Sequence, residues 1–298
     1  MINKYITLHP QYFLKEGFGT LMSHYAVMYS LYRDINIIPI ILDINFKSQK
    51  LTSAMEGFNN FSKKIIYHHE AFVNFGNIFL TINEKDLNNY NWVLSNFSNL
   101  TYEQLVTKIQ LQNNNIVCIW SLNPDLTSKY LNDIINNLFI FNKDIIDISK
   151  NYLPNTNKEI VAVCVRNEYK TFDCPHTKLS LNFYIEAMKH YNINNSTYLV
   201  FSDDIEECKR IFKKLENTFD IVYTQQMQSA IGMCTMSLCD HIICANSSFS
   251  YWASLLNRNA TKKIVCSKYF IDQDKHPELA NLLNDKWYSK SWTALDIS

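Results

Sequence analysis

Hydrophobic and polar positions alternate in a regular order along the second half of the chain. Short apolar runs, each long enough for one buried strand, are separated by segments whose apolar residues recur at the spacing of a single helix face. The pattern predicts strands over residues 160–165, 198–202, 220–223, 242–245 and 263–267, and helices over 184–191, 205–215, 227–238 and 249–256. Strands that alternate with amphipathic helices favour a parallel, doubly wound sheet, so the fold class is α/β.

The first half begins with the same order of elements. Residues 4–9 predict a strand, a helix follows, and residues 37–44 predict a second, buried strand. The helix face is marked by Met22, Tyr25, Ala26 and Tyr29. Gly17 and Gly19, two of only five glycines in the chain, stand before this helix, so we expect a turn that needs open backbone geometry. Such a turn either lets a ligand or the other domain approach the backbone or is a plain tight turn.

The pattern weakens farther along the first half. Residues 115–120 predict another strand and residues 127–138 a helix, whereas 46–112 are polar, rich in Asn and hard to assign. Within that region residues 64–68 suggest a strand that ends at His68, and His69 and Glu70 follow it. Neighbouring residues on a strand point to opposite faces, so we expect no metal site there.

A polar segment divides the chain. Residues 151–159 are polar and are broken by Pro154, a composition typical of a linker. We therefore expect an N-terminal domain, residues 1–150, and a C-terminal domain, residues 151–298. A chain of 298 residues is long enough for two domains of ordinary size.

Charge and composition exclude several classes of partner. Lys plus Arg and Asp plus Glu each number 28, so no basic excess indicates nucleic acid or an anionic membrane. The N-terminus lacks a signal-peptide apolar region, and no run approaches the roughly 18 apolar residues of a membrane span. The cysteines that lie inside apolar segments, as buried free thiols do, are Cys118, Cys164, Cys244 and Cys266. We expect a cytoplasmic protein without a transmembrane segment, and the oligomeric state stays open.

The most informative stretch runs from His241 to Asn257. A short apolar run is followed by Asn246, Ser247 and Ser248, which suit a helix N-cap. The helix face after them is marked by Phe249, Trp252, Ala253 and Leu256. A helix start flanked by hydroxyl groups presents N–H donors and a positive dipole end, which suit an anion. The alternative is an ordinary capped helix of an α/β fold.

Two other predicted strand ends carry polar residues. Arg166 and Glu168 follow the strand over 160–165, and Asp203 and Asp204 follow the strand over 198–202. Ligands of open α/β sheets bind at the carboxyl ends of the strands, where these groups and the helix start would meet. Arg166 suits a phosphate, and either aspartate suits a ribose or a base edge. The pattern therefore predicts a nucleotide-diphosphate site, with a structural Arg–Asp pair and helix caps as the alternative.

Several blocks resemble a known family. Asn-Ser-Ser-Phe-Ser-Tyr-Trp-Ala over residues 246–253 is similar to a motif of glycosyltransferase family 11, the α-1,2-fucosyltransferases. Phe-Ser-Asp-Asp (201–204), Met-Ser-Leu-Cys-Asp-His-Ile-Ile (236–243) and Gly-Phe-Gly-Thr-Leu-Met (17–22) resemble further blocks of that family, in the same order. The resemblance covers most of the chain and is strongest in the last hundred residues.

The resemblance implies a GT-B fold of two Rossmann-like domains with parallel sheets, in which the C-terminal domain binds most of the donor. It implies an inverting, metal-independent transferase with no cofactor besides its donor substrate, typically GDP-L-fucose, and with a glycan hydroxyl as acceptor in α-1,2 linkage. Arg166 would contact the donor diphosphate, and Asp203 or, preferably, Asp204 the base or ribose. The residues that would line the phosphates are Asn246, Ser247, Ser248 and Ser250. Gly17 and Gly19 would face the cleft between the domains.

One motif departs from the family. The family pattern His-x-Arg-Arg-x-Asp reads Cys164-Val-Arg166-Asn167-Glu168-Tyr169 here. Cysteine is a weak hydrogen-bonding group and does not replace a histidine that helps to bind guanine. The donor is therefore GDP-fucose held differently or a UDP- or dTDP-linked deoxysugar, or the chain is a binding protein without catalysis. For a general base we consider Glu168, beside the diphosphate arginine, and His24, near the glycine turn.

Overall fold

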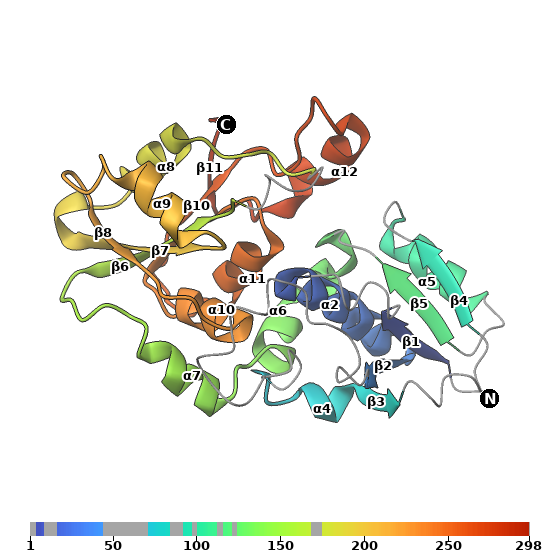
Figure 1. Cartoon of the computed structure of the whole chain (residues 1–298). Helices are drawn as coiled ribbons and strands as arrows, with labels where there is room; N and C mark the ends of the chain where they lie inside the picture. The colour runs from blue at the N-terminus through green and yellow to red at the C-terminus, as the bar shows by residue number, and fades with distance from the viewer. Residues whose placement is uncertain are drawn as a thin grey trace. The chain divides into compact units, whose positions relative to one another are not determined.

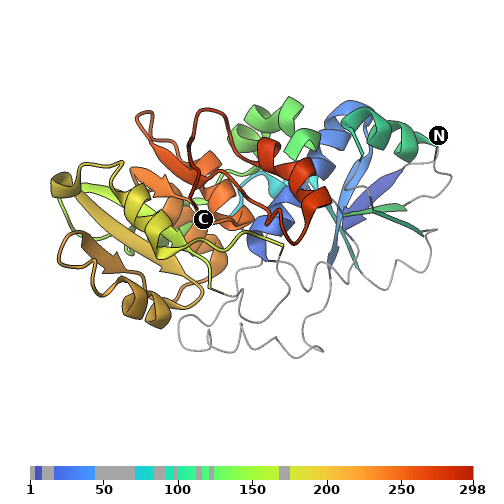
Figure 2. The ribbon, with the colours of Figure 1, turned by 90° about the horizontal axis from the view of Figure 1, so that it is seen from above.

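The computed structural model describes residues 4–8, 17–43, 71–83, 92–96, 100–111, 116–120, 124–167 and 175–297. The chain forms two compact units, Met1–Asn142 and Lys143–Ser298, and each has its own parallel sheet (Figures 1 and 2). The division comes a few residues before the boundary expected at residue 150. Helix α7 (Lys143–Lys150) belongs to the second unit because it packs against helix α10 (Ser229–Ser237).

The first unit contains a five-stranded sheet in the order β3-β2-β1-β5-β4. Its strands are β1 (Tyr5–Leu8), β2 (Ile38–Asp43), β3 (Leu80–Asn83), β4 (Trp92–Asn96) and β5 (Ile116–Trp120). Its helices are α2 (Phe18–Ile35), α4 (Phe75–Ile78), α5 (Tyr102–Gln110) and α6 (Leu131–Asp133). The helix predicted over 127–138 is broken into short pieces, since α6 lies between a 3-10 turn, Ser128–Tyr130, and a π-helical turn, Ile134–Leu138.

The glycine pair before α2 does not make the expected turn. Gly17 has φ −72° and ψ 160° and is the N-cap of α2, and Gly19 lies buried in its first turn. None of the described glycines has a positive φ. A Cβ atom added at Gly17 would meet no other atom within 4 Å. The prediction of open backbone geometry was therefore wrong, because these residues simply begin the helix in an ordinary backbone conformation.

The second unit contains a six-stranded sheet in the order β11-β10-β9-β6-β7-β8, in which all pairs are parallel. Its strands are β6 (Glu159–Val165), β7 (Ser196–Ser202), β8 (Asp220–Tyr223), β9 (His241–Ile243), β10 (Ile264–Ser267) and β11 (Thr293–Leu295). The predicted parallel α/β sheet is confirmed. The sequence pattern missed β11 and the helix before it, α12 (Pro277–Trp287), and placed the end of β9 two residues too late.

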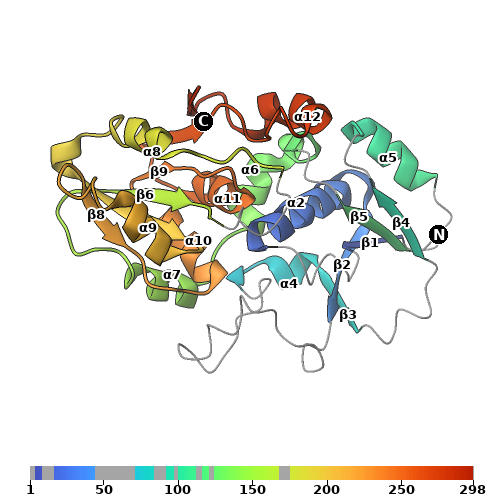
Figure 3. The same ribbon diagram turned by 45° about the horizontal axis from the view of Figure 1, so that its top comes forward.

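Helices cover both faces of the second sheet (Figures 1 and 3). Val161, Val163 and Val165 of β6 pack in one core with α8 (Leu181–Met188) and α9 (Ile205–Phe212). Helix α11 (Ser248–Leu256) packs against the residue that directly follows β9, since the Cys244 sulfur lies 3.1 Å from the Ser254 hydroxyl. The predicted free and buried state of Cys164, Cys244 and Cys266 is confirmed, whereas Cys118 lies in a strand whose side chains are not described.

Within the described ranges no group of three His, Cys, Asp or Glu side chains is placed to hold a metal ion. His68, His69 and Glu70 lie outside the described residues. No described helix combines the length and the apolar composition that crossing a membrane requires.

The contact between α12 and the loop after β10 gives a stability prediction. The Trp287 ring is 2% exposed and stacks on the Phe270 ring, with centroids 4.0 Å apart. We expect Trp287→Ala to lower the free energy of unfolding by about 3–5 kcal/mol, because the substitution removes buried apolar surface and leaves a cavity. Urea unfolding checks this, with Leu111→Ala as control because Leu111 is 75% exposed. Equal effects of the two substitutions would show that α12 does not stabilise the fold.

Candidate functional site

Three polar segments meet at the carboxyl edge of the second sheet. Strand β6 lies between β7 and β9. Val165 of β6 pairs with Ser202 of β7, so Arg166 and Asp203 leave the sheet side by side. Val163 pairs with Ile243, the last residue of β9, and the chain then turns into α11. The convergence expected from strand order is therefore present.

Asp203 holds the Arg166 side chain and the loop behind it. Its Oδ2 lies 3.5 Å from Nε of Arg166, and its Oδ1 accepts the N–H of Asn167 at 2.8 Å and the hydroxyl of Ser202 at 3.2 Å. The Asp203 side chain is 12% exposed, whereas Arg166 is 39% exposed. The aspartate therefore pairs with the arginine at the strand edge, and more than a third of the Arg166 side chain stays accessible.

Asp204 has a different role. Its Oδ1 accepts the N–H of Glu207 at 3.0 Å, so it is the N-cap of α9. Its own N–H donates to the Ser202 hydroxyl at 3.0 Å. The Asn167 side chain donates to the same hydroxyl at 3.3 Å and thereby joins the end of β6 to the end of β7. Asp204 and Asn167 thus organise the strand edge.

The start of α11 is a tight serine turn. Ser247 is the N-cap and accepts the N–H of Phe249 at 3.1 Å. Ser250 is completely buried and donates to the carbonyl oxygens of Ala245, at 2.9 Å, and Ser247, at 3.1 Å. Ser248 is half-buried in the first turn. The turn therefore presents Ser248 and the positive end of the helix dipole, while the Ser250 hydroxyl bonds carbonyls inside the turn.

Asn246 directly precedes the N-cap of α11 and is 0% exposed. Its amide donates to the carbonyls of Thr177 and Tyr269, at 2.8 and 2.9 Å. The Tyr288 hydroxyl donates to its Oδ1 at 3.2 Å. The side chain therefore connects loops of the protein, whereas the sequence analysis placed it among the donor-binding residues.

His176 is a buried residue of the second unit that no sequence pattern marks, since a single histidine in an irregular segment gives no pattern. Its ring lies against the Phe270 ring, with centroids 4.5 Å apart, and the residue forms an antiparallel bridge with Ile271. Burial lowers the pKa of His176 to about 4, and the positive charge of Arg166 acts in the same direction. The imidazole is therefore neutral at pH 7.

The remaining predicted residues belong to the first unit or fall outside the described residues. His24 lies within α2 and is 0% exposed, so its imidazole does not present a surface to an acceptor hydroxyl. This placement argues against His24 as the general base. Gly17 and Gly19 belong to the first unit with His24, whereas Arg166 belongs to the second. Glu168 lies outside the described residues.

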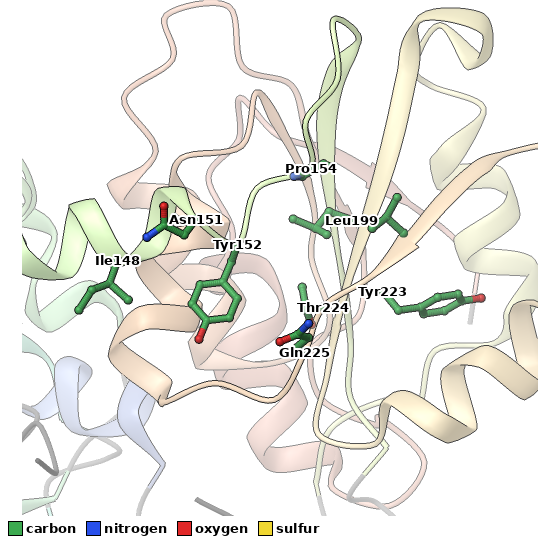
Figure 4. Close-up of a pocket in the computed structure, with 9 residues that line it drawn as sticks. Ile148, Asn151, Tyr152, Pro154, Leu199, Tyr223, Thr224 and Gln225 are labelled. Atoms are coloured by element: carbon green, nitrogen blue, oxygen red, sulfur yellow. The ribbon is translucent and has the colours of Figure 1, made fainter. Parts of the chain in front are cut away.

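A cavity of about 420 Å³ lies beside β7 and β8 in the second unit (Figure 4). Its residues come from α7 and the segment before β6, from the two strands, and from the residues after β8: Ile148, Asn151, Tyr152, Pro154, Leu199, Val222, Tyr223, Thr224 and Gln225. None of these nine described residues is charged, so the lining offers no cation for a diphosphate. The strand edge around Arg166 is the better anion site.

The protein is thus a two-unit α/β protein whose second sheet ends in an edge with an arginine and a helix start, groups that suit an anion. The family model described as glycosyl transferase family 11 matches residues 34–295. Because the match covers most of the chain, this protein belongs to glycosyltransferase family 11, and the predicted family is confirmed.

Two relatives from Escherichia coli are similar in sequence. The O-antigen biosynthesis glycosyltransferase WbnK is 27% identical over 202 residues, which span 62% of this chain and 65% of WbnK. An alpha-1,2-colitosyltransferase is 32% identical over 84 residues, which span 27% of this chain and 29% of the relative. The matched part is thus less than two thirds of the length of either relative.

Two solved structures are similar to this chain. POFUT1 in complex with GDP has a TM-score of 0.51 and 11% identity, with 89% of this chain and 99% of that chain covered. Fucosyltransferase NodZ from Bradyrhizobium has a TM-score of 0.48 and 14% identity, with 86% and 94% covered. The GT-B fold with two Rossmann-like units and parallel sheets, expected from the sequence, is confirmed.

The hydrogen bonds of the two aspartates predict that substitution of Asp203 lowers ligand affinity and substitution of Asp204 lowers stability. Asp203→Ala removes the carboxylate that fixes Arg166, so we expect about tenfold weaker pyrophosphate binding, since bonds to charged groups contribute about 1.5–3 kcal/mol. Asp204→Ala removes a helix cap, so we expect about 1 kcal/mol lower stability and unchanged affinity. Calorimetric titration and urea unfolding measure the two effects. Loss of affinity in Asp204→Ala alone would make Asp204 the ligand-binding carboxylate, as the sequence analysis preferred.

The lowered pKa of His176 predicts a pH dependence of stability. Its pKa is about 4 in the folded protein and 6.5 for the unperturbed group, so between these values the unfolded chain binds the extra proton. The contribution of the neutral ring is therefore present above pH 6.5 and is lost as the pH falls toward 4. We expect wild type to lose stability more steeply than His176→Asn between pH 7 and 4.5, measured by urea unfolding. Parallel curves would contradict a buried, neutral His176.

Proposed function

We propose that this protein transfers a deoxysugar from a nucleotide diphosphate to a glycan hydroxyl with inversion, without a metal ion. The preferred donor is GDP-L-fucose and the preferred linkage is α-1,2. The observation that carries the proposal is the half-exposed Arg166, fixed by Asp203 at the strand edge next to the start of α11, in a chain of glycosyltransferase family 11. The names of the two relatives, an O-antigen biosynthesis glycosyltransferase and an alpha-1,2-colitosyltransferase, support a glycan acceptor and a deoxysugar donor.

The leaving group sets the main chemical demand. When the bond between the anomeric carbon and the diphosphate breaks, negative charge grows on the phosphate oxygens. Arg166 supplies a fixed positive charge and planar N–H donors, and the first turn of α11 supplies a helix dipole and the hydroxyl of Ser248. These groups stabilise the leaving diphosphate in the role that a metal ion has in other transferases.

The acceptor hydroxyl attacks the anomeric carbon from the side opposite the diphosphate, which inverts the configuration. A base that takes its proton speeds this step. Of the two candidates, His24 is buried, so Glu168, two residues after Arg166, is the base that we propose. Asp203 acts in this scheme by holding Arg166.

Cys164 bears on the identity of the nucleotide. Its thiol is 6% exposed and interacts with the Ala245 backbone and the Ser250 side chain, and burial raises its pKa to about 12. A neutral thiol is only a weak hydrogen-bonding group, so Cys164 offers a nucleobase less than the histidine of the family motif would. This placement favours, as a second candidate, a donor with a UDP or dTDP carrier, since the histidine of the family motif is not replaced by an equivalent group.

A thermal-shift panel with GDP, UDP, dTDP and ADP tests the proposal. A ligand at 100 times its dissociation constant stabilises by about 2.7 kcal/mol, which corresponds to a shift of roughly 5–10 °C. We expect a shift with one of the first three nucleotides, and loss of that shift in Arg166→Ala. Arg210→Ala is the control, because Arg210 is an exposed arginine of α9 that pairs with Glu207.

The outcomes separate the alternatives. A shift with GDP supports a fucose-type donor, and a shift with UDP or dTDP supports the second candidate. Release of the sugar from the matching donor, with or without acceptor, distinguishes a transferase from a binding protein. Unchanged nucleotide affinity in Arg166→Ala would overturn the placement of the site, and no shift with any nucleotide would overturn the proposed donor.

A further inference from the structure

The buried amide of Asn246 joins four loops of the second unit at the candidate donor edge. Asn246 lies in the turn between β9 and α11 and is 0% exposed. Its amide bonds the Thr177 carbonyl, before α8, and the Tyr269 carbonyl, after β10. The Tyr288 hydroxyl, after α12, donates to Asn246 Oδ1 at 3.2 Å and lies 3.1 Å from the Ala245 carbonyl. We call this set of contacts the Asn246 junction.

Two of the joined loops are also bonded to each other. The Thr177 N–H donates to the Phe270 carbonyl at 3.1 Å, and the Asp272 N–H donates to the Pro175 carbonyl at 2.8 Å. The Asn284 side chain of α12 accepts the N–H of Ile271 at 2.7 Å and donates to its carbonyl at 3.1 Å. The loop after β10 is thus held from both sides, and the Asn246 amide ties the α11 turn to this rigid frame.

The junction reaches both parts of the candidate anion site. Asn246 directly precedes Ser247 and Ser248, which begin α11. Val163 of β6 pairs with Ile243 at the end of β9, so the turn that contains Asn246 leaves the sheet at the same edge as Arg166. The buried amide therefore holds the first turn of α11, at that edge, to the loops of Thr177 and Tyr269.

We propose that Asn246 is a positioning residue for the donor diphosphate: it does not touch the ligand but sets, through the Asn246 junction, the place of Ser247 and Ser248 relative to Arg166. Tyr288 supports it from the other side of the turn. The inference rests on the proposed function, in which the diphosphate binds at this edge. It moves Asn246 from the ligand-binding group, where the sequence analysis placed it, to the frame that holds that group.

The chain supplies a matched control at the other end of the same helix. Asn257 is the C-cap residue of α11 and is 2% exposed. Its amide donates to the Cys239 carbonyl at 2.6 Å, and its Oδ1 accepts the N–H of Asn259 at 2.9 Å. Loss of this amide removes a comparable buried contact, but at the opposite end of the helix from the serine turn.

The experiment compares Asn246→Ala, Asn246→Asp, Tyr288→Phe and Asn257→Ala with wild type. Inorganic pyrophosphate is the probe, since it is common to every nucleotide diphosphate, and calorimetry is done well below the melting temperature of each variant. We expect both Asn→Ala variants to melt at lower temperature. Only Asn246→Ala should bind pyrophosphate about tenfold or more weakly, because small displacements of binding groups weaken binding strongly.

The other two variants test the mechanism of the effect. Asn246→Asp keeps the size and one oxygen but points a carboxylate at two carbonyls, so we expect a loss of affinity at least as large as in Asn246→Ala. Tyr288→Phe removes one hydroxyl and should weaken binding about threefold while the protein stays folded. In turnover assays with the matching sugar donor, the donor KM should rise while the acceptor KM is unchanged.

Each opposing result has a distinct meaning. Equal pyrophosphate affinities in Asn246→Ala and Asn257→Ala would reduce Asn246 to a structural role. If Asn246→Ala does not fold, unchanged affinity in Tyr288→Phe overturns the inference instead. Weaker binding in Asn246→Ala without a change in melting temperature would indicate direct contact and also overturn it. If wild type does not bind pyrophosphate, or if Arg166→Ala binds it as tightly as wild type, the proposed function fails and not this inference alone.

Discussion

The register of strand β6 between β7 and β9 decides where the polar chemistry of the second unit lies. Val165 opposite Ser202 puts Arg166 next to Asp203, and Val163 opposite Ile243 brings the turn into α11 to the same edge. Side chains alternate between the faces of a sheet, so a slip of one residue would send Val161, Val163 and Val165 out of the core of α8 and α9. The packing of three valines in the core thus fixes the position of the arginine.

Most of the second unit was predictable from sequence because its signals are local. Its inner strands are unbroken apolar runs, and its helices carry apolar faces at regular spacing. Strand β11 escaped prediction because Thr293 and Ala294 are exposed and no apolar run marks it; it is a strand only because β10 offers it a free edge. At Gly17 the sequence predicts an unusual turn that the backbone does not adopt, since glycine permits unusual conformations but does not require them.

At the site, the meeting of the polar segments was predictable from the sequence, whereas the roles of the individual residues were not. The meeting of Arg166, Asp203 and the serine turn follows from the rule that parallel strands end at one edge. The individual roles do not follow, because a sequence does not show which partner a hydrogen-bonding side chain selects. Asp204 bonds a helix amide, Ser250 bonds carbonyls and Asn246 bonds two loops. His176 and Tyr288 come from irregular segments, where a single residue has no pattern around it.

The four loops joined at Asn246 come from widely separated parts of the chain, and the last of them begins at Tyr288. Synthesis proceeds from the N-terminus, and domains fold as units once their residues have left the ribosome. Strands β6, β7 and β8 can pair early, but the edge that carries Arg166 is completed only when α12 and Tyr288 emerge. The edge that carries Arg166 is therefore among the last parts of the nascent protein to assemble, so a growing chain completes the core of the second unit before this edge.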